Sequence, residues 1–125
     1  MKNAKKIRDY IEKIEEAYEY MLAYAAQGRA EEGAGPDGAQ IRTFLKQFSD
    51  ALKDLDSHTP DIAKENPPSK NFLEFFKSEA NVMASILEVL LARDNISSEV
   101  IDNTNGLISV RAYLTSLFFL DKSVL

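Results

Sequence analysis

The sequence predicts an all-α fold, an antiparallel bundle of about four helices in a single domain that spans residues 1–125. Apolar residues recur at spacings of three and four along most of the chain, which is the pattern of one buried face of an α-helix. Glycine and proline are concentrated in two segments, residues 28–38 and 56–68, where they would separate the helices. A chain of 125 residues suits one ordinary domain.

The first predicted helix runs from about Asn3 to Gln27 and is amphipathic. Its apolar stripe consists of Ile7, Tyr10, Ile11, Ile14, Ala17, Tyr18, Met21 and Ala25, and its opposite face carries Glu12, Glu15, Glu16 and Glu19. Gly28 favours the end of this helix, because glycine adopts the left-handed conformation of a helix terminus at low cost. Residues 29–38 mix glycine, proline and charged side chains, so we expect them to form a mobile loop.

The second predicted helix begins at Asp37, which can act as its N-cap and form a capping box with Gln40. Its narrow apolar stripe predicts one buried face and consists of Ile41, Phe44, Leu45, Phe48, Leu52 and Leu55. Residues 56–68 contain three prolines, which cannot continue a helix. This segment is predicted to be a long Pro-containing loop between the second and third helices, with at most a short turn at Ile62.

The third predicted helix extends from Lys70 to Arg93, with Ser69 as its cap, and is the most apolar element of the chain. Its apolar side chains cover an arc of roughly 200° around the helix axis. We therefore expect this helix to contact neighbours on more than one side, at the centre of the bundle.

The fourth predicted helix extends from residue 97 or 98 to 121 and folds back antiparallel to the third, because the link between them is short. Asn105 and Gly106 form a turn signal inside it, so a short helix followed by a longer one from Leu107 is an alternative. A β-hairpin over residues 107–120 is a further alternative, because this segment is rich in β-branched and aromatic residues.

Two charged residues fall within apolar stripes of the last two predicted helices. Glu79 lies sixteen residues before Asn95 and Arg111 lies sixteen residues after it, so a hairpin folded about Asn95 places them opposite each other. A charge left unpaired in a core costs several kcal/mol. We therefore predict a structural ion pair between Glu79 and Arg111. The alternatives are a polar anchor in a ligand pocket and a shifted register that leaves both side chains exposed.

The fourth predicted helix is apolar on more sides than two neighbours can cover, which favours an additional contact surface. The candidate interface residues are Ile108, Tyr113, Phe119 and Leu120 on this helix and Tyr20 and Tyr24 at the edge of the first. They would contact a partner protein or a second copy in a homodimer. The alternative is that the first helix and the proline-rich segment cover them within one chain.

Composition and motifs exclude several classes of function. Cysteine is absent, which excludes disulfides and thiolate metal sites and favours a cytoplasmic location. The net charge is −5 and the basic residues are scattered, so we expect no nucleic acid partner. The apolar runs are too short to cross a bilayer, so we expect no membrane partner.

No catalytic, metal or cofactor motif is present in the sequence. Ser57, His58 and Asp61 are residue types of a hydrolase triad, but neighbours in one short segment rarely adopt the required geometry. A diiron bundle needs Glu-x-x-His on two helices, and the single histidine has no glutamate three residues before it. We therefore predict that the chain is not an enzyme and binds no cofactor.

These observations predict an acidic, non-enzymatic protein-protein interaction module, an accessory, adaptor or regulatory protein that presents a helix face. One alternative is a small helical sensor or carrier that binds an apolar ligand between helices lined by Met21 and Met83. Another is an acidic inhibitor or immunity-type protein, whose acids would gather on the first helix or near Glu31, Glu32 and Asp37.

Overall fold

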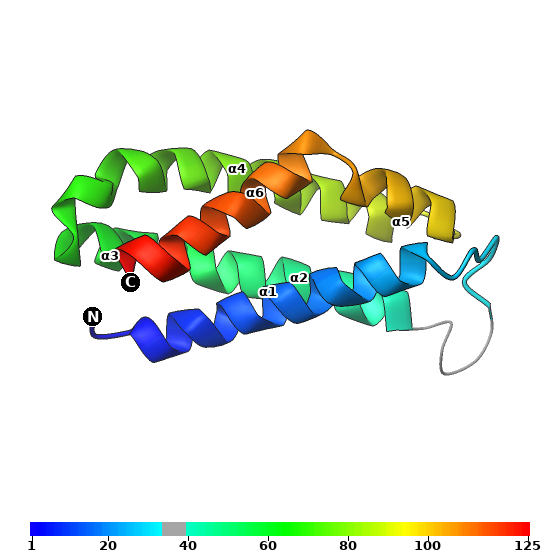
Figure 1. Ribbon diagram of the computed structural model, residues 1–125, viewed down its shortest axis with the longest axis horizontal. Helices are drawn as coiled ribbons and strands as arrows, with labels where there is room; N and C mark the ends of the chain where they lie inside the picture. Colours follow the sequence, from blue (N-terminus) through cyan, green and yellow to red (C-terminus); the bar gives the residue numbers. More distant parts are fainter. Residues whose placement is uncertain (34–39) are drawn as a thin grey trace.

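The structure, a computed structural model, describes residues 1–33 and 40–125 (Figure 1). Within these residues the chain forms six α-helices and no strand, which confirms the all-α prediction and shows that the β-hairpin alternative is wrong. The helices are α1 (Ala4–Ala25), α2 (Gln40–Asp56), α3 (Thr59–Glu65), α4 (Lys70–Leu91), α5 (Ser98–Asn105) and α6 (Ile108–Phe119). A 3-10 turn, η1 (Pro67–Ser69), precedes α4, and a π-helical turn, η2 (Leu120–Val124), follows α6.

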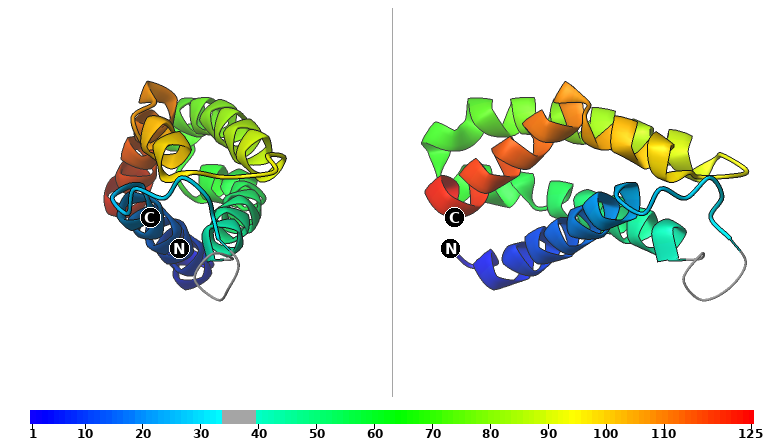
Figure 2. Two further views of the ribbon diagram at one scale, coloured as in Figure 1. Left: turned by 90° about the vertical axis from the view of Figure 1, so that its right-hand side faces the viewer. Right: turned by 45° about the vertical axis from the view of Figure 1, so that its right-hand side comes forward.

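The helices form columns around one hydrophobic core, and Figure 2 shows this arrangement end-on. The columns are α1, α2, α4 and the pair α5 and α6, with successive columns antiparallel and both termini at one end (Figure 1). Helix α1 packs against α2 and α5, and α4 packs against α2 and α6. Helix α4 is thus one of four columns around the core, and its predicted central position is wrong.

Helix α4 buries one stripe rather than a broad arc. The buried residues are Leu73, Phe76, Ala80, Met83, Leu87 and Leu90. Phe75, Val82 and Val89 remain exposed, although they contributed to the predicted arc. Apolar periodicity shows which side chains can be buried, but it does not show how many neighbouring helices are available to cover them.

The proline-rich segment contains a helix instead of the predicted loop. Pro60 lies in the first turn of α3, where the missing N–H group would have no helical partner and the fixed φ of proline suits the helix. Ile62 is fully buried and anchors α3 to the core. The prolines of this segment therefore begin helical turns rather than prevent them.

The fourth column is broken at Gly106, which confirms the alternative that the Asn105-Gly106 dipeptide suggested. Gly106 ends α5, and Leu107 has an extended backbone with ψ of 132° before α6 begins. The side-chain amide of Asn105 donates a hydrogen bond to the backbone carbonyl of Met21, at 3.2 Å, and holds the break against α1. Because of this break, the buried face of α6 differs from the one that a continuous helix predicts.

At the end of the bundle opposite the termini, Arg42 and Glu32 form a bidentate ion pair. The Arg42 Nε and Nη2 atoms lie 2.9 and 2.7 Å from the two carboxylate oxygens. Arg42 also donates to the backbone carbonyls of Leu91 and Arg93 at the end of α4. The hydrogen bond from Arg42 holds the pKa of Glu32 below its ordinary value, aided by the backbone N–H of Ile96. This arrangement joins three segments of the chain.

Residues 29–33 are anchored at the same end, which corrects the prediction that they belong to a mobile loop. The backbone N–H of Arg29 donates to the hydroxyl of Ser98, and the N–H of Ser98 donates to the carbonyl of Arg29. Residues 34–38, and with them the predicted N-cap Asp37, lie outside the described residues.

Candidate functional site

The structure does not pair Glu79 with Arg111. The ion pairs within the described residues are Arg8 with Asp121, Arg42 with Glu32 and Lys122 with Asp121. Arg111 is exposed, whereas Glu79 is half-buried and lines a groove together with Ala112, the next residue after Arg111. Glu79 and the residue that follows Arg111 therefore border the same groove. The predicted orientation is wrong, because the break at Gly106 leaves Arg111 on the solvent-exposed side of α6.

The six predicted interface residues divide into exposed and buried positions. Ile108 is 84% exposed and Phe119 is 50% exposed. Tyr113 and Leu120 are fully buried, because they lie on the inward face of α6 together with Val110 and Leu117. The spacing in a continuous fourth helix instead predicts an inward stripe of Leu107, Val110, Leu114, Leu117 and Phe118.

The two predicted interface tyrosines of α1 pack within the chain. Tyr24 is fully buried, and its hydroxyl donates a hydrogen bond of 2.6 Å to the carbonyl of Ile96, so it cannot meet a partner. Tyr20 is half-buried and stacks on Phe44, with ring centroids 4.3 Å apart. Both tyrosines therefore help to pack α1 within the bundle.

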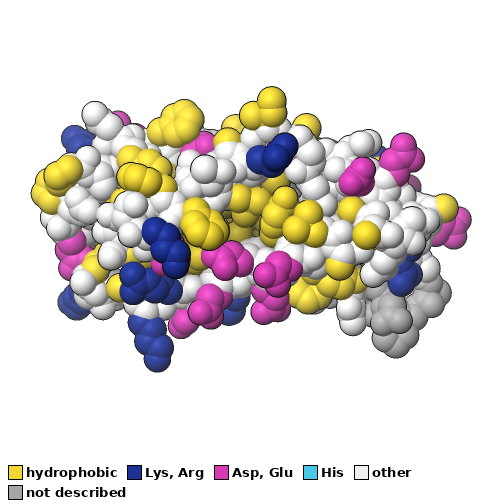
Figure 3. Space-filling model, in the orientation of Figure 1, with side chains coloured by type: hydrophobic (Ala, Val, Ile, Leu, Met, Phe, Trp, Pro, Cys, Tyr) yellow, Lys and Arg dark blue, Asp and Glu magenta, His cyan; other side chains and the backbone are white. Residues whose placement is uncertain are grey.

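Exposed hydrophobic side chains gather on α4 and α6 instead. We call the surface formed by Phe75, Val82, Val89, Ile108 and Phe119 the α4–α6 face. The three residues of α4 are spaced by seven and so share one side of the helix. Phe119 packs edge-on against Phe72 of α4, with centroids 4.9 Å apart, which joins the two helices. Figure 3 shows hydrophobic side chains along α6 and at the edge of the molecule where α4 runs.

A groove of about 260 Å³ lies between α4 and α6. It is lined by Phe75, Ser78, Glu79 and Val82 of α4 and by Ser109 and Ala112 of α6. The serine and alanine side chains are small and leave space between the helices. Glu79 supplies the only charged side chain of the lining. The groove could therefore accept apolar side chains together with one cationic group.

Within the described residues, four side-chain oxygens are shielded from solvent and have no hydrogen-bond partner. One is Glu79 Oε1 in this groove, and the others are Tyr113 Oη, Asp56 Oδ1 and Asn105 Oδ1. Burial raises the pKa of the Tyr113 phenol, and the nearby charges of Asp56 and Glu79 raise this pKa further. The Tyr113 ring stacks on Phe76 with centroids 5.2 Å apart, so the hydroxyl is held in place within the core. Burying polar groups without partners costs free energy, which marks this region as unusual within the fold.

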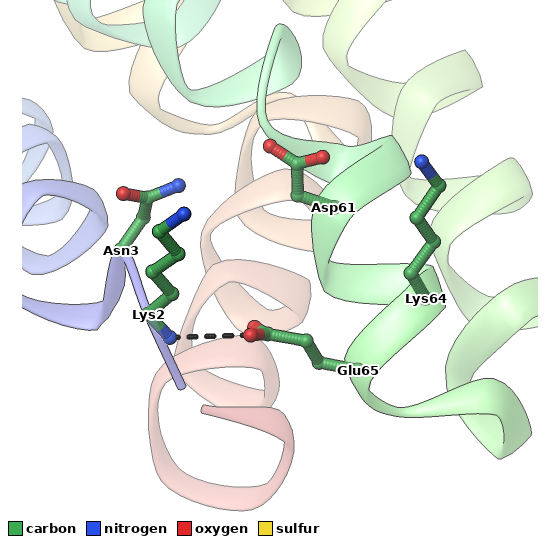
Figure 4. Close-up of a pocket in the computed structure, with 5 residues that line it drawn as sticks. All are labelled: Lys2, Asn3, Asp61, Lys64 and Glu65. Atoms are coloured by element: carbon green, nitrogen blue, oxygen red, sulfur yellow. Dashed lines mark hydrogen bonds between the residues drawn. The ribbon is translucent and has the colours of Figure 1, made fainter.

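A second hollow, of about 210 Å³, lies where the N-terminus meets α3 (Figure 4). It is lined by Lys2, Asn3, Asp61, Lys64 and Glu65. The backbone nitrogen of Lys2 donates to Glu65 at 3.3 Å, and Figure 4 shows the Lys2 and Lys64 side chains well apart, with Asp61 between them. The charges are mixed and do not converge on one point.

The residue types of a hydrolase triad do not assemble. The Ser57 hydroxyl donates to the carbonyl of Asp54 at 2.6 Å, and the His58 ring stacks on Tyr10 with centroids 5.7 Å apart. His58 is thus engaged with α1 rather than with Ser57. Across the part of the chain that the structure describes, no group of three or more histidine or acidic side chains is arranged to hold a metal ion.

Two further findings concern the chain as a whole. None of the described helices has the length and apolar character needed to cross a membrane. Compared with known proteins, the chain matches no protein-family model, no curated protein and no solved structure.

Proposed function

We propose that this protein is a non-enzymatic interaction module, an accessory, adaptor or regulatory protein that binds another protein chain through the α4–α6 face. The observation that carries this proposal is the combination of exposed phenylalanine, valine and isoleucine side chains with a groove that contains an unpartnered carboxylate oxygen. Contiguous exposed apolar surface is typical of protein interaction sites, and aromatic residues are enriched in them.

The exposed side chains contribute little to the fold that the structure shows. Phe75 is 62% exposed and Val89 is 64% exposed, while the core stripe of α4 is complete without them. Covering such side chains would remove apolar area from water at about 25 cal/mol per Å², which favours binding. Their placement therefore supports a role in association more than a role in stability.

Site-specific photocrosslinking in the native cell tests this proposal. A photoreactive phenylalanine analogue replaces Phe75 on the α4–α6 face, and in a control protein it replaces Lys53, which is exposed on α2. We expect a discrete protein adduct from position 75 and no adduct, or only diffuse ones, from position 53. Equal adducts from both positions, or none from position 75, would contradict the proposal.

A second candidate is an acidic inhibitor that binds a basic protein through α1. Burial raises the pKa of Glu15, and the nearby acids Asp121, Glu12 and Glu19 raise it further, partly offset by Lys122, which supports an acidic surface around this helix. Such a surface would accelerate association with a basic partner in a salt-dependent manner. Reversing two of the charges, Glu12→Lys with Glu19→Lys, should then lower the association rate, whereas binding through the α4–α6 face should be unaffected.

The carrier alternative receives less support from the structure. Met21 and Met83, the residues expected to line a ligand site, are fully buried in the core and surrounded by packed side chains. The hollows described above lie at the surface, between helices or beside the N-terminus. An apolar ligand would require the core to open.

A further inference from the structure

We propose that the partner of the α4–α6 face is a second copy of this chain, bound about a twofold axis so that Glu79 of each protomer pairs with Arg111 of the other. This inference rests on the proposed function, because it names the partner of the same surface.

Charge complementarity is the first argument. Glu79 Oε1 is shielded from solvent and has no hydrogen-bond partner among the residues that the structure describes, in a groove whose described lining is otherwise uncharged. Arg111 is exposed, and its guanidinium takes part in none of the ion pairs within the described residues. Each protomer therefore offers one unpaired anion and one unpaired cation. A planar guanidinium is well suited to satisfy a partly buried carboxylate, because it can donate two parallel hydrogen bonds.

The relative position of the two residues is the second argument. Glu79 lines the same groove as Ala112, the residue that follows Arg111, so Glu79 and Arg111 lie near each other along the bundle. A twofold axis that runs along the groove, parallel to the helices and between the two contacting faces, exchanges the protomers without changing the level of any residue. Arg111 of the partner subunit then approaches Glu79, and the converse pair forms at the same time, since isologous contacts are reciprocal. Residues at different levels could not form both pairs.

The surroundings of the two charges are the third argument. Phe75 and Val82 flank the groove on α4, and Ile108 lies at the start of α6, so these apolar side chains would be covered in the dimer. A stable interface buries about 800 Å² per partner, which is about one ninth of the 7112 Å² surface of this chain. Two adjacent helices, one of them about 33 Å long, offer a face of comparable size.

Sedimentation equilibrium with charge-reversal variants tests the dimer. We expect the wild-type chain to form a reversible dimer at micromolar concentration. Glu79→Arg and Arg111→Glu should each raise the dimer dissociation constant by about thirtyfold or more, because each change places like charges in both pairs. A mixture of the two variants should form a heterodimer, since every pair in it again joins opposite charges. Lys53→Glu, a charge reversal on exposed α2, should leave the dimer unchanged.

A wild-type chain that is monomeric throughout the micromolar range would overturn the inference. So would a mixture of the two folded variants that fails to associate. If Glu79→Arg loses its helical circular dichroism signal, Glu79→Gln is used in its place. The Glu79→Gln variant should dimerise more weakly than the wild type, and its mixture with Arg111→Glu should not associate. The photocrosslinking experiment separates the two proposals, because an adduct with a different protein from position 75 of a monomeric chain supports the interaction module and rejects self-association.

Discussion

Two regions of the molecule differ in how completely their polar groups are paired: the end of the bundle around Arg42 and the α4–α6 face. At the first, Glu32 and Arg42 are paired, and Arg42 also reaches two backbone carbonyls of the α4 terminus. At the second, Glu79 in the groove and Tyr113 in the core beneath it each bury an oxygen that has no partner among the described residues. The first arrangement contributes to folding, whereas the second costs free energy in the isolated chain. This difference is one reason for our proposal that the α4–α6 face serves association.

The largest effect expected from this comparison concerns two arginines. Arg42→Ala removes a bidentate ion pair and two hydrogen bonds to backbone carbonyls, so we expect the free energy of unfolding to fall by about 2 kcal/mol. Arg111→Ala is the matched control, because Arg111 is exposed and forms no ion pair with the other described residues. It should change that value by less than about 0.5 kcal/mol. Urea unfolding at a concentration where the chain is monomeric measures both. Similar losses for the two variants would contradict the comparison.

The two fully buried tyrosines, Tyr24 and Tyr113, provide a second test of the same contrast. Tyr24 donates a hydrogen bond to the Ile96 carbonyl, whereas the Tyr113 hydroxyl has no partner in the described part of the chain. Tyr24→Phe should therefore destabilise the fold by about 1.5 kcal/mol, because the carbonyl loses its donor. Tyr113→Phe should be neutral or stabilise the fold by up to about 1 kcal/mol, because it removes an unpartnered polar atom. Thermal unfolding followed by circular dichroism compares the stabilities of the two variants directly. A greater loss of stability for Tyr113→Phe than for Tyr24→Phe would contradict this contrast.

The pH dependence of stability reports on Glu32. Its pKa in the folded chain lies below the ordinary value of 4.5, chiefly because of the hydrogen bond from Arg42. The ionised carboxylate therefore stabilises the fold above about pH 4.5, and this contribution is lost as the pH falls through the lower, folded value. Glu32→Gln should be less stable than wild type at pH 7 by about 1 kcal/mol, and the two should converge in acid. If the difference in unfolding free energy between Glu32→Gln and wild type stays constant from pH 7 into acid, the charge of Glu32 is not the source of the stabilisation.

The smallest expected effect concerns Asp56. Burial raises its pKa, partly offset by the nearby charge of Lys77, so the ionised form is disfavoured in the folded chain. Asp56→Asn should stabilise the protein at pH 7 by no more than about 0.5 kcal/mol, because Asp56 is partly exposed and its charge is screened. This advantage should shrink as the pH falls and Asp56 of the wild type becomes protonated. Denaturant titrations at two pH values test both statements.

Local patterns in the sequence predict most of the helices. The three-and-four spacing of apolar residues predicts α1, α2 and α4, and the Asn105-Gly106 dipeptide predicts the break before α6. Pro60 leads to a wrong prediction of a loop, because proline is unsuitable for the interior of a helix but suits its first turn. These features depend on near neighbours in the chain.

Contacts between distant segments are harder to predict. The level of Glu79 relative to Arg111 follows from counting residues about the turn, but the direction in which Arg111 points depends on the backbone of Leu107. The pair of Glu32 and Arg42 is missed because Glu32 lies in a glycine-rich segment that resembles a free loop. The unpartnered hydroxyl of Tyr113 has no local signal, since the pattern treats tyrosine as an apolar residue.

The most direct test of the central claim separates stability from association in one protein. A variant with Phe75→Ser, Val82→Ser and Ile108→Ser removes three exposed side chains of the α4–α6 face, and Leu87→Ala in the buried stripe of α4 is the control. Unfolding free energy and molecular mass by light scattering are measured for both. We expect the triple variant to remain within about 1 kcal/mol of wild type and to lose association, whereas Leu87→Ala should lose about 3 kcal/mol. A triple variant that loses several kcal/mol while associating as the wild type does would show that these side chains serve the fold and not a partner.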